Sequence, residues 1–250
     1  GDSIFGNYRD TSEDDKSISK MIAEQTDSIC YNVGFGGCRM ATHSNYWDAF
    51  SMHSLADSIV SSDWTLQEKA LADGAQTLPA YFSETINCLK EINWNEIDYI
   101  TIAYGTNDYS GNVFLHGTEH SFTNEWDSFK GALKYSIRTI QNAYPDIQIV
   151  IITPMWRFFI NDGNYSHSSD DPESVNTRGY LLTEYVSACF EIAEELQIPC
   201  IDTYYTLGIN QSNYLNYFNS YDGTHPNTNG RLLRANVISN ALLDFERTKK

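Results

Sequence analysis

Residues 97–108 read IDYITIAYGTND, an apolar run that stops at a glycine. The first eight residues are mostly β-branched, aromatic or otherwise apolar, which is typical of a buried strand. The glycine and the three polar residues after it place Asn107 on the loop at the carboxyl end of that strand. Open α/β sheets bind their ligands along this edge. The segment therefore predicts an open sheet with Asn107 at its ligand-binding edge.

The rest of the chain alternates between helix and strand patterns. Apolar residues recur at helical spacing in the longer segments, and short continuous apolar runs separate them. Such alternation predicts parallel strands covered by helices, and 250 residues suffice for a single domain spanning 1–250. Helices are predicted over 15–26, 78–92, 122–144, 175–196 and 227–245, and strands over 27–33, 97–104, 147–153 and 199–202.

The two ends of the chain carry residues that fit one catalytic mechanism. Residues 1–3 read GDS, and residues 222–227 read DGTHPN, just before the last predicted helix. A serine is a poor nucleophile unless a base within hydrogen-bond reach takes its proton, and a carboxylate orients that base. Ser3 supplies the hydroxyl, His225 the base and Asp222 the carboxylate. Together they predict a Ser-His-Asp triad.

A glycine-rich turn at residues 32–37, NVGFGG, adds a second part of that mechanism. Acyl transfer requires hydrogen-bond donors aimed at the oxyanion that develops on the substrate. Glycine lets a backbone N–H approach a substrate oxygen closely. The Asn107 side chain and the backbone N–H groups of Gly37 and Ser3 are therefore the predicted oxyanion-hole donors.

With these four blocks in this order, the sequence resembles the SGNH (GDSL-type) hydrolase family. The matching residues are Ser3 in Gly-Asp-Ser, Gly37 in Asn-x-Gly-x-x-Gly, Asn107 in Gly-Thr-Asn-Asp and His225 in Asp-x-x-His-Pro. The blocks span residues 1–227, nearly the whole chain. The resemblance implies a flavodoxin-like, three-layer α/β/α sandwich with a parallel sheet, and ester hydrolysis through an acyl-serine intermediate without a cofactor.

Two features depart from the family pattern. Gly36 stands before the second-block glycine, where a serine or a similar residue is common. In this architecture the nucleophile follows the first buried strand, yet Ser3 is the third residue of the chain. We expect that upstream residues supplying this strand are absent from the sequence; the alternative is a sheet completed in an unusual way.

Three residues are candidates for substrate binding. Arg157 and Trp156 follow the predicted strand 147–153, on the same sheet edge as Asn107, and Arg39 follows the glycine-rich turn. A guanidinium at this edge can meet a polar or anionic part of a substrate. The alternative for Arg157 is a salt bridge to one of the many surface carboxylates.

The loops around the predicted site are polar and lack core periodicity. They cover residues 36–50, 109–121 and 156–173. Within them, His116 and His120 have a spacing that metal ligands use, and 162–173 holds several acidic residues. A solvated loop is the simpler interpretation of both features, so no metal site is predicted.

Composition limits the partners. The formal net charge is −17 with a pI near 4.5, whereas nucleic acids and anionic membranes require basic surfaces. No apolar run approaches the roughly 18 residues of a membrane span. No targeting signal is present in the sequence, and secretion stays open if an upstream segment is missing. Nothing in the sequence indicates an oligomeric state.

The residues predict a serine esterase that acts on a small-molecule or carbohydrate ester. Because the loops are polar and aromatic, we favour a short acyl group, such as acetyl, on a carbohydrate or another polar carrier. Three alternatives use the same fold. They are an acyltransferase with the same triad, a lipase or lysophospholipase of the SGNH type, and a non-catalytic carbohydrate-binding module.

Overall fold

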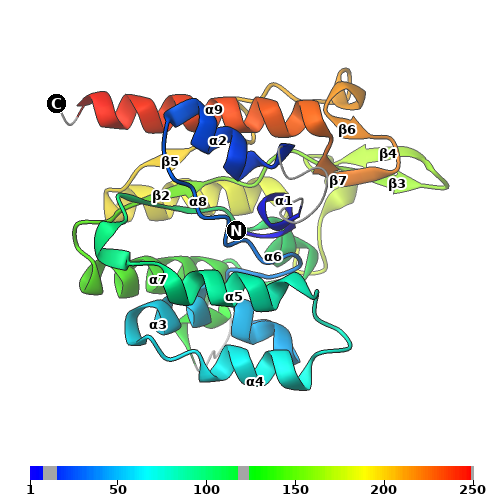
Figure 1. The fold of residues 1–250 in the computed structure, drawn as a ribbon. Coiled ribbons are helices and arrows are strands. Elements are labelled where there is room, and N and C mark those ends of the chain that lie inside the picture. The colour runs from blue at the N-terminus through cyan, green and yellow to red at the C-terminus, as the bar shows by residue number, and fades with distance from the viewer. Residues whose placement is uncertain (8–15, 118–123, 249–250) are drawn as a thin grey trace.

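Three parallel strands form the central sheet of a computed structural model that describes residues 1–7, 16–117 and 124–248 (Figure 1). Their order is β1-β2-β5, with Tyr99 opposite Gln148 and Ile152 opposite Ile201. The strands are β1 (Tyr99–Ile102), β2 (Gln148–Ile152) and β5 (Cys200–Ile201). Their carboxyl ends lie at one edge of the sheet, as the sequence predicts.

Helices cover both faces of this sheet. Figure 1 shows α2 and α9 side by side on one face and α7 on the other, with α3 packed against α7. The three-layer α/β/α fold is therefore confirmed. The longer helices are α2 (Ile18–Thr26), α3 (Met52–Ser61), α4 (Thr65–Asp73), α5 (Tyr81–Glu91), α7 (Phe129–Ala143), α8 (Leu182–Leu196) and α9 (Thr228–Thr248).

The five helices predicted from periodicity are present, several with later starts. Helix α7 begins after Ser128, whose hydroxyl accepts the Gly131 N–H. The first two residues of the predicted helix 122–144 lie outside the described residues, and so does Asp15 of the predicted helix 15–26. Helix α8 begins at Leu182 because Asn176 folds residues 176–180 into a turn, accepting the Arg178 and Tyr180 N–H groups. The sequence patterns do not predict helices α3 and α4.

The predicted strand 27–33 is wrong. Residues 28–35 form no ladder with another strand in the described part of the chain, and Ile29 is 83% exposed. Here the Phe35 N–H donates to the Gly1 carbonyl (2.8 Å), and Gly1 lies against the Ala103 carbonyl. The N-terminal residues therefore separate this segment from β1, and a strand requires a neighbour to pair with.

Two antiparallel hairpins lie beyond the carboxyl edge of the sheet. The first, β3 (Phe158–Asn161) with β4 (Asn164–Ser168), occupies the segment predicted as an irregular loop over 156–173. The second pairs β6 (Phe218–Asn219) with β7 (Asp222–Pro226), and β7 contacts β3. These hairpins, rather than loops, carry part of the candidate site.

Short helical turns complete the described chain. No helix within the described ranges is long and apolar enough to cross a membrane. The short elements are α1 (Ser3–Gly6), α6 (Thr106–Ser110), η2 (Asn45–Phe50), η3 (Trp94–Glu96), η5 (Glu125–Asp127), η6 (Pro172–Ser174) and η7 (Tyr214–Asn216).

Candidate active site

The structure brings Ser3 and His225 into direct contact. Ser3 is the first residue of α1, and the Asp2 carboxylate caps this helix by accepting the Ile4 N–H at 3.0 Å. The cap fixes the position of Ser3, whose Oγ lies 2.8 Å from His225 Nε2. Both side chains are half-buried. A hydroxyl proton can therefore pass directly to the imidazole.

Asp222 holds the other side of the His225 ring. Its Oδ2 lies 2.8 Å from His225 Nδ1, and its Oδ1 accepts the backbone N–H groups of Thr224 (2.9 Å) and His225 (3.0 Å). Burial raises the pKa of Asp222, but the hydrogen bonds from His225 and Thr224 outweigh it and lower the pKa to about 2. An ionised Asp222 favours the tautomer with its proton on Nδ1, which leaves Nε2 free to accept the serine proton.

The residue between Asp222 and Thr224 has to be glycine. A Cβ atom on Gly223 would lie 2.0 Å from the Phe158 carbonyl oxygen. Strand β7 therefore packs directly against the backbone of β3, and this contact fixes the strand that bears both Asp222 and His225.

The glycine-rich turn lies beside the serine. Gly37 has φ +80°, a left-handed conformation that favours glycine, and the preceding Gly36 lies close to Ser3 Cβ. The Gly36 N–H donates to the Tyr81 hydroxyl at 2.8 Å, which holds the turn from the side of α5. The turn therefore reaches the neighbourhood of the Ser3 hydroxyl.

Asn107 is oriented by the residue that follows the turn. Its Nδ2 donates one hydrogen to the Cys38 carbonyl oxygen at 2.9 Å. An amide nitrogen has two hydrogens, so the second is available to a substrate. The structure thus places the three predicted oxyanion-hole residues on α1, on the turn and on α6.

Asp108 fastens the same turn to α6. Its carboxylate is fully buried and accepts the N–H groups of Met40 (3.0 and 3.1 Å to its two oxygens) and Ala41 (3.0 Å). Burial raises the pKa of Asp108 to about 6, while those hydrogen bonds and the charge of Arg39 oppose the rise. Asn107 and Asp108 together set the distance between the turn and the sheet edge.

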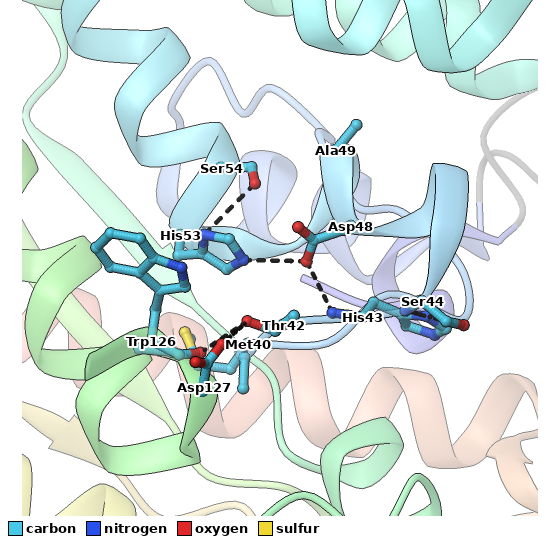
Figure 2. Close-up of polar contacts among 12 residues, drawn as sticks. Met40, Thr42, His43, Ser44, Asp48, Ala49, His53, Ser54, Trp126 and Asp127 are labelled. Atoms are coloured by element: carbon cyan, nitrogen blue, oxygen red, sulfur yellow. Dashed lines mark hydrogen bonds and ion pairs between the residues drawn. The ribbon is translucent and has the colours of Figure 1, made fainter. Parts of the chain in front are cut away.

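A further polar network holds the loop that continues from Ala41 (Figure 2). The Asp48 carboxylate accepts the His43 N–H at 2.7 Å and lies 3.1 Å from His53 Nε2. The His53 ring stacks on Trp126, with centroids 5.7 Å apart. Burial raises the pKa of Asp48, but these hydrogen bonds from His53 and His43 lower it overall. The network connects the loop to α3 and to η5.

This network contains the same three residue types as the triad, in an arrangement unsuited to catalysis. Ser54 Oγ is 3.4 Å from Nδ1 of the adjacent His53, a distance too long for a strong hydrogen bond. Ser54 is 5% exposed and lies within α3. A substrate cannot reach it, so the network supports the loop.

The three candidate substrate-binding residues have different surroundings. The guanidinium of Arg157 contacts α6 through Thr106 (3.0 Å) and Ser110 (3.1 Å), and Arg39 lies against Gly111 at the end of that helix. No carboxylate within the described ranges forms an ion pair with Arg157, so the predicted alternative of a surface salt bridge is wrong.

Trp156, the third candidate substrate-binding residue, does not contact α6 in the way that Arg157 does. Its indole is 4% exposed, packs near Phe158 and Phe218, and donates from Nε1 to Asp170 at 3.3 Å. It lines an open pocket of about 440 Å³ that contains no member of the triad. In the described part of the chain, no group of three or more His, Cys, Asp or Glu side chains is placed to hold a metal ion; His120 lies outside the described residues.

Sequence reasoning missed several residues that support the site. Asp108 lies in a recognised block, and its position shortly after a buried strand is the signal for a carboxylate that accepts backbone N–H groups. No sequence pattern marks Tyr81 or Trp47, because each reaches the turn through the tertiary fold. Trp47 lies so close to Gly37 that a Cβ there would be 3.1 Å from its ring.

The fold, the order of the four blocks and the Ser-His-Asp contact are those of an SGNH-type carboxylic-ester hydrolase. The chain belongs to the GDSL-like lipase/acylhydrolase family, whose model matches residues 1–232. No curated protein matches the chain.

Solved structures share the fold at low identity. The chain is 19% identical to a possible lipase from Chitinophaga pinensis (98% and 96% of the two chains covered, TM-score 0.60). It is 14% identical to an aryl esterase from M. smegmatis (98% and 96% covered, TM-score 0.57). Its identity to Est24, a carbohydrate acetylesterase from Sinorhizobium meliloti, is 12% (98% and 96% covered, TM-score 0.55).

The lowered pKa of Asp222 predicts how stability responds to acid. The carboxyl has a pKa of about 2 in the folded protein and an ordinary value of 3.8, so the folded state binds this proton less readily than the unfolded chain. Its hydrogen bonds therefore contribute stability above about pH 4 that is lost as the pH falls toward 2. Between about pH 5 and about pH 3, Asp222→Asn should lose less free energy of unfolding than the wild type.

Urea unfolding followed by circular dichroism across this range measures the difference. Asp146→Asn, at an exposed carboxylate, is the control and should follow the wild type. Equal acid losses in the wild type and in Asp222→Asn would contradict the assignment.

Proposed function

We propose that the protein is a serine esterase in which Ser3, His225 and Asp222 form the catalytic triad. The observation that carries the proposal is the continuous hydrogen-bond chain from Ser3 Oγ to His225 (2.8 Å) and from His225 to Asp222 (2.8 Å). A non-catalytic carbohydrate-binding module has no need for this alignment. The geometry therefore favours an enzyme.

The reaction proceeds through an acyl-serine. His225 Nε2 takes the proton of Ser3 Oγ as that oxygen attacks the ester carbonyl carbon, and Asp222 stabilises the resulting imidazolium. When the tetrahedral intermediate collapses, His225 gives the proton to the leaving alcohol. Water, deprotonated by the same imidazole, then attacks the acyl-serine and releases the acid.

Three donors stabilise the oxyanion. They are the N–H groups of Ser3 and Gly37 and the second hydrogen of Asn107 Nδ2. The bond from Asn107 to Cys38 holds this amide before a substrate arrives. Donors that are already oriented stabilise a developing charge without a cost of reorganisation at the moment of reaction.

The surroundings of the turn favour a short acyl group on a polar carrier such as a carbohydrate. Trp47 stands against Gly37, and His43 stacks on Trp47 with centroids 5.8 Å apart. Arg39 and Arg157 lie along α6. Aromatic rings and guanidinium groups suit a sugar, and a carbohydrate acetylesterase is among the proteins that share the fold. A lipase or lysophospholipase would need an extended aliphatic surface here.

Covalent labelling tests the nucleophile. A fluorophosphonate probe should label the wild type and abolish its esterase activity, whereas Ser3→Ala should neither react nor hydrolyse esters. Loss of a triad member typically costs about 10⁴-fold or more in kcat.

Ser54→Ala is the matched control, because Ser54 also lies beside a histidine that contacts an aspartate. This variant should keep both labelling and activity. If Ser3→Ala retained activity within about tenfold of the wild type, the triad assignment would be wrong.

Asn107→Ala tests the oxyanion hole. It should lower kcat by ~10²–10³, equivalent to about 2.7–4 kcal/mol, with a smaller change in KM, because the charge it stabilises exists only in the transition state. Steady-state kinetics and a thermal melt measure the two effects separately. An increase in KM alone would mean that Asn107 binds the substrate and does not stabilise the oxyanion.

The acyl-length profile tests the substrate class. With p-nitrophenyl esters, kcat/KM should be highest for acetyl or propionyl and should fall for longer chains. An apolar groove would instead add roughly 0.8 kcal/mol for each buried methylene. O-acetylated sugars should be better substrates than any triglyceride. A maximum at about eight carbons would refute the short-acyl proposal and leave the triad assignment intact.

Adding an acceptor alcohol separates hydrolysis from acyl transfer. Products should contain the free acid with and without a sugar acceptor. Formation of a new acyl-sugar in preference to the acid would identify an acyltransferase.

A further inference from the structure

Arg157 is a half-buried cation that forms no ion pair with a carboxylate in the described ranges. Its Nη1 donates to the hydroxyls of Thr106 and Ser110, and its guanidinium lies 5.2 Å from the centre of the Phe159 ring. Its Nε is buried and makes no hydrogen bond. Neutral hydroxyls orient this guanidinium on α6 without neutralising its charge. The charge therefore remains available to a ligand.

Arg39 has similar surroundings. Its guanidinium lies at the C-terminal end of α6, the helix that Arg157 also contacts. It is half-buried, its Nε is buried without a hydrogen-bond partner, and it forms no ion pair with a carboxylate in the described ranges. Its guanidinium lies on the backbone of Gly111, where a Cβ atom would come within 2.1 Å of Nη2. Only a residue without a side chain leaves room for the guanidinium in this position.

The two arginines contact residues of the segment that carries the candidate oxyanion donor Asn107: Arg157 contacts Thr106 and Ser110, and Arg39 lies against Gly111. Residues four apart lie on the same face of a helix. Thr106 and Ser110, which Arg157 contacts, therefore share one face of α6. Asn107 and the C-cap residue Gly111, which Arg39 contacts, share the adjacent face. Arg39 follows Cys38, whose carbonyl accepts the hydrogen bond from Asn107. The carboxylates whose charges act on the two arginines are already engaged by other hydrogen bonds: Asp222 and Asp2 near Arg157, and Asp108 near Arg39.

Cations elsewhere in the described ranges differ in this respect: several pair with carboxylates, whereas the buried Arg234 donates to the Thr153 carbonyl and forms no ion pair. The chain has 33 acidic and 16 basic residues, so carboxylates are abundant. Several other cations use them. The pairs are Lys69 with Asp73, Lys90 with Glu68, Lys130 with Glu191, Lys134 with Glu195 and Arg247 with Asp244. Half-buried guanidinium groups lose hydration, and a bound anion would compensate for that loss.

We propose that Arg39 and Arg157 form a subsite for a carboxylate on the substrate, so that the preferred ester carries an acid group close to the scissile bond. An O-acetylated acidic sugar has this chemistry. The proposal rests on the proposed esterase function and narrows its substrate class. The planar guanidinium matches the two oxygens of a carboxylate, which gives selectivity as well as affinity.

A matched pair of aryl acetates tests the subsite. 4-Acetoxybenzoate carries a carboxylate, and methyl 4-acetoxybenzoate replaces it with a neutral ester of similar shape. The wild type should hydrolyse the anionic compound with a kcat/KM about 10- to 100-fold higher, as expected for hydrogen bonds to a charged group. Arg157→Met and Arg39→Met should each reduce this ratio by about tenfold or more, mainly through KM.

Two further variants separate charge recognition from support of the helix. Gly111→Ala keeps every charge but pushes the guanidinium of Arg39 aside, at a backbone φ of −86° that alanine tolerates; it should reduce the ratio as Arg39→Met does. Arg247→Met, at an exposed ion pair, should leave the ratio unchanged. If the arginine variants lowered kcat/KM equally for both esters, their role would be structural and the proposal would be overturned.

Binding without turnover keeps this test independent of catalysis. Calorimetric titration of Ser3→Ala with 4-acetoxybenzoate should show binding that adding Arg157→Met weakens by about tenfold or more, and methyl 4-acetoxybenzoate should bind more weakly than the anion. Hydrolysis of both esters at equal rates, or equal binding of the two, would refute the subsite. Binding of the anion in a wild type that hydrolyses neither ester would refute the esterase function alone.

Discussion

The buried carboxylate of Asp108 joins two segments that are far apart in the sequence. It lies one residue after the candidate oxyanion donor Asn107 and accepts the N–H groups of Met40 and Ala41. Without it, those N–H groups would be buried and unpaired, at a cost of about 1–3 kcal/mol each. The relative position of Gly37 and Asn107 depends on this contact. A fully buried carboxylate outside the candidate triad thus contributes to the alignment of a site built from separate loops.

A second buried charge ties the serine to the rest of the fold. Arg234, on α9, is 2% exposed, donates to the Thr153 carbonyl at 3.1 Å and lies 4.9 Å from the centre of the Phe5 ring. Burial lowers the pKa of Arg234 to about 10, and the nearby charge of Asp2 opposes this shift. The same Asp2 caps the helix that begins at Ser3. The last helix, the end of β2 and the candidate nucleophile thus share one electrostatic environment.

Much of this arrangement could be predicted from local patterns. The apolar runs at 97–104 and 147–153 identify β1 and β2, and the short blocks supply the three residues that the structure brings into contact as a candidate triad. The strand predicted over 27–33 was wrong because local propensity does not tell whether a neighbouring strand exists. The hairpin at 158–168 was missed because its second strand, β4, carries only one large apolar side chain, Tyr165, which is too few for a recognisable strand pattern. Contacts such as Tyr81 to Gly36 or Arg39 to Gly111 arise only when distant segments pack together, so the hydrophobic periodicity of the sequence does not predict them.

The candidate triad joins Ser3 and His225, which are 222 positions apart in the chain. Ser3 is fixed by its own short helix, whereas His225 depends on β7, which is held by β3 and followed by α9. The hydrogen bond between Ser3 and His225 therefore forms only when the whole domain is folded. During synthesis, the nucleophile emerges from the ribosome long before its base, so a nascent or truncated chain carries an unactivated serine. The contact that would activate the serine therefore forms only in the folded domain.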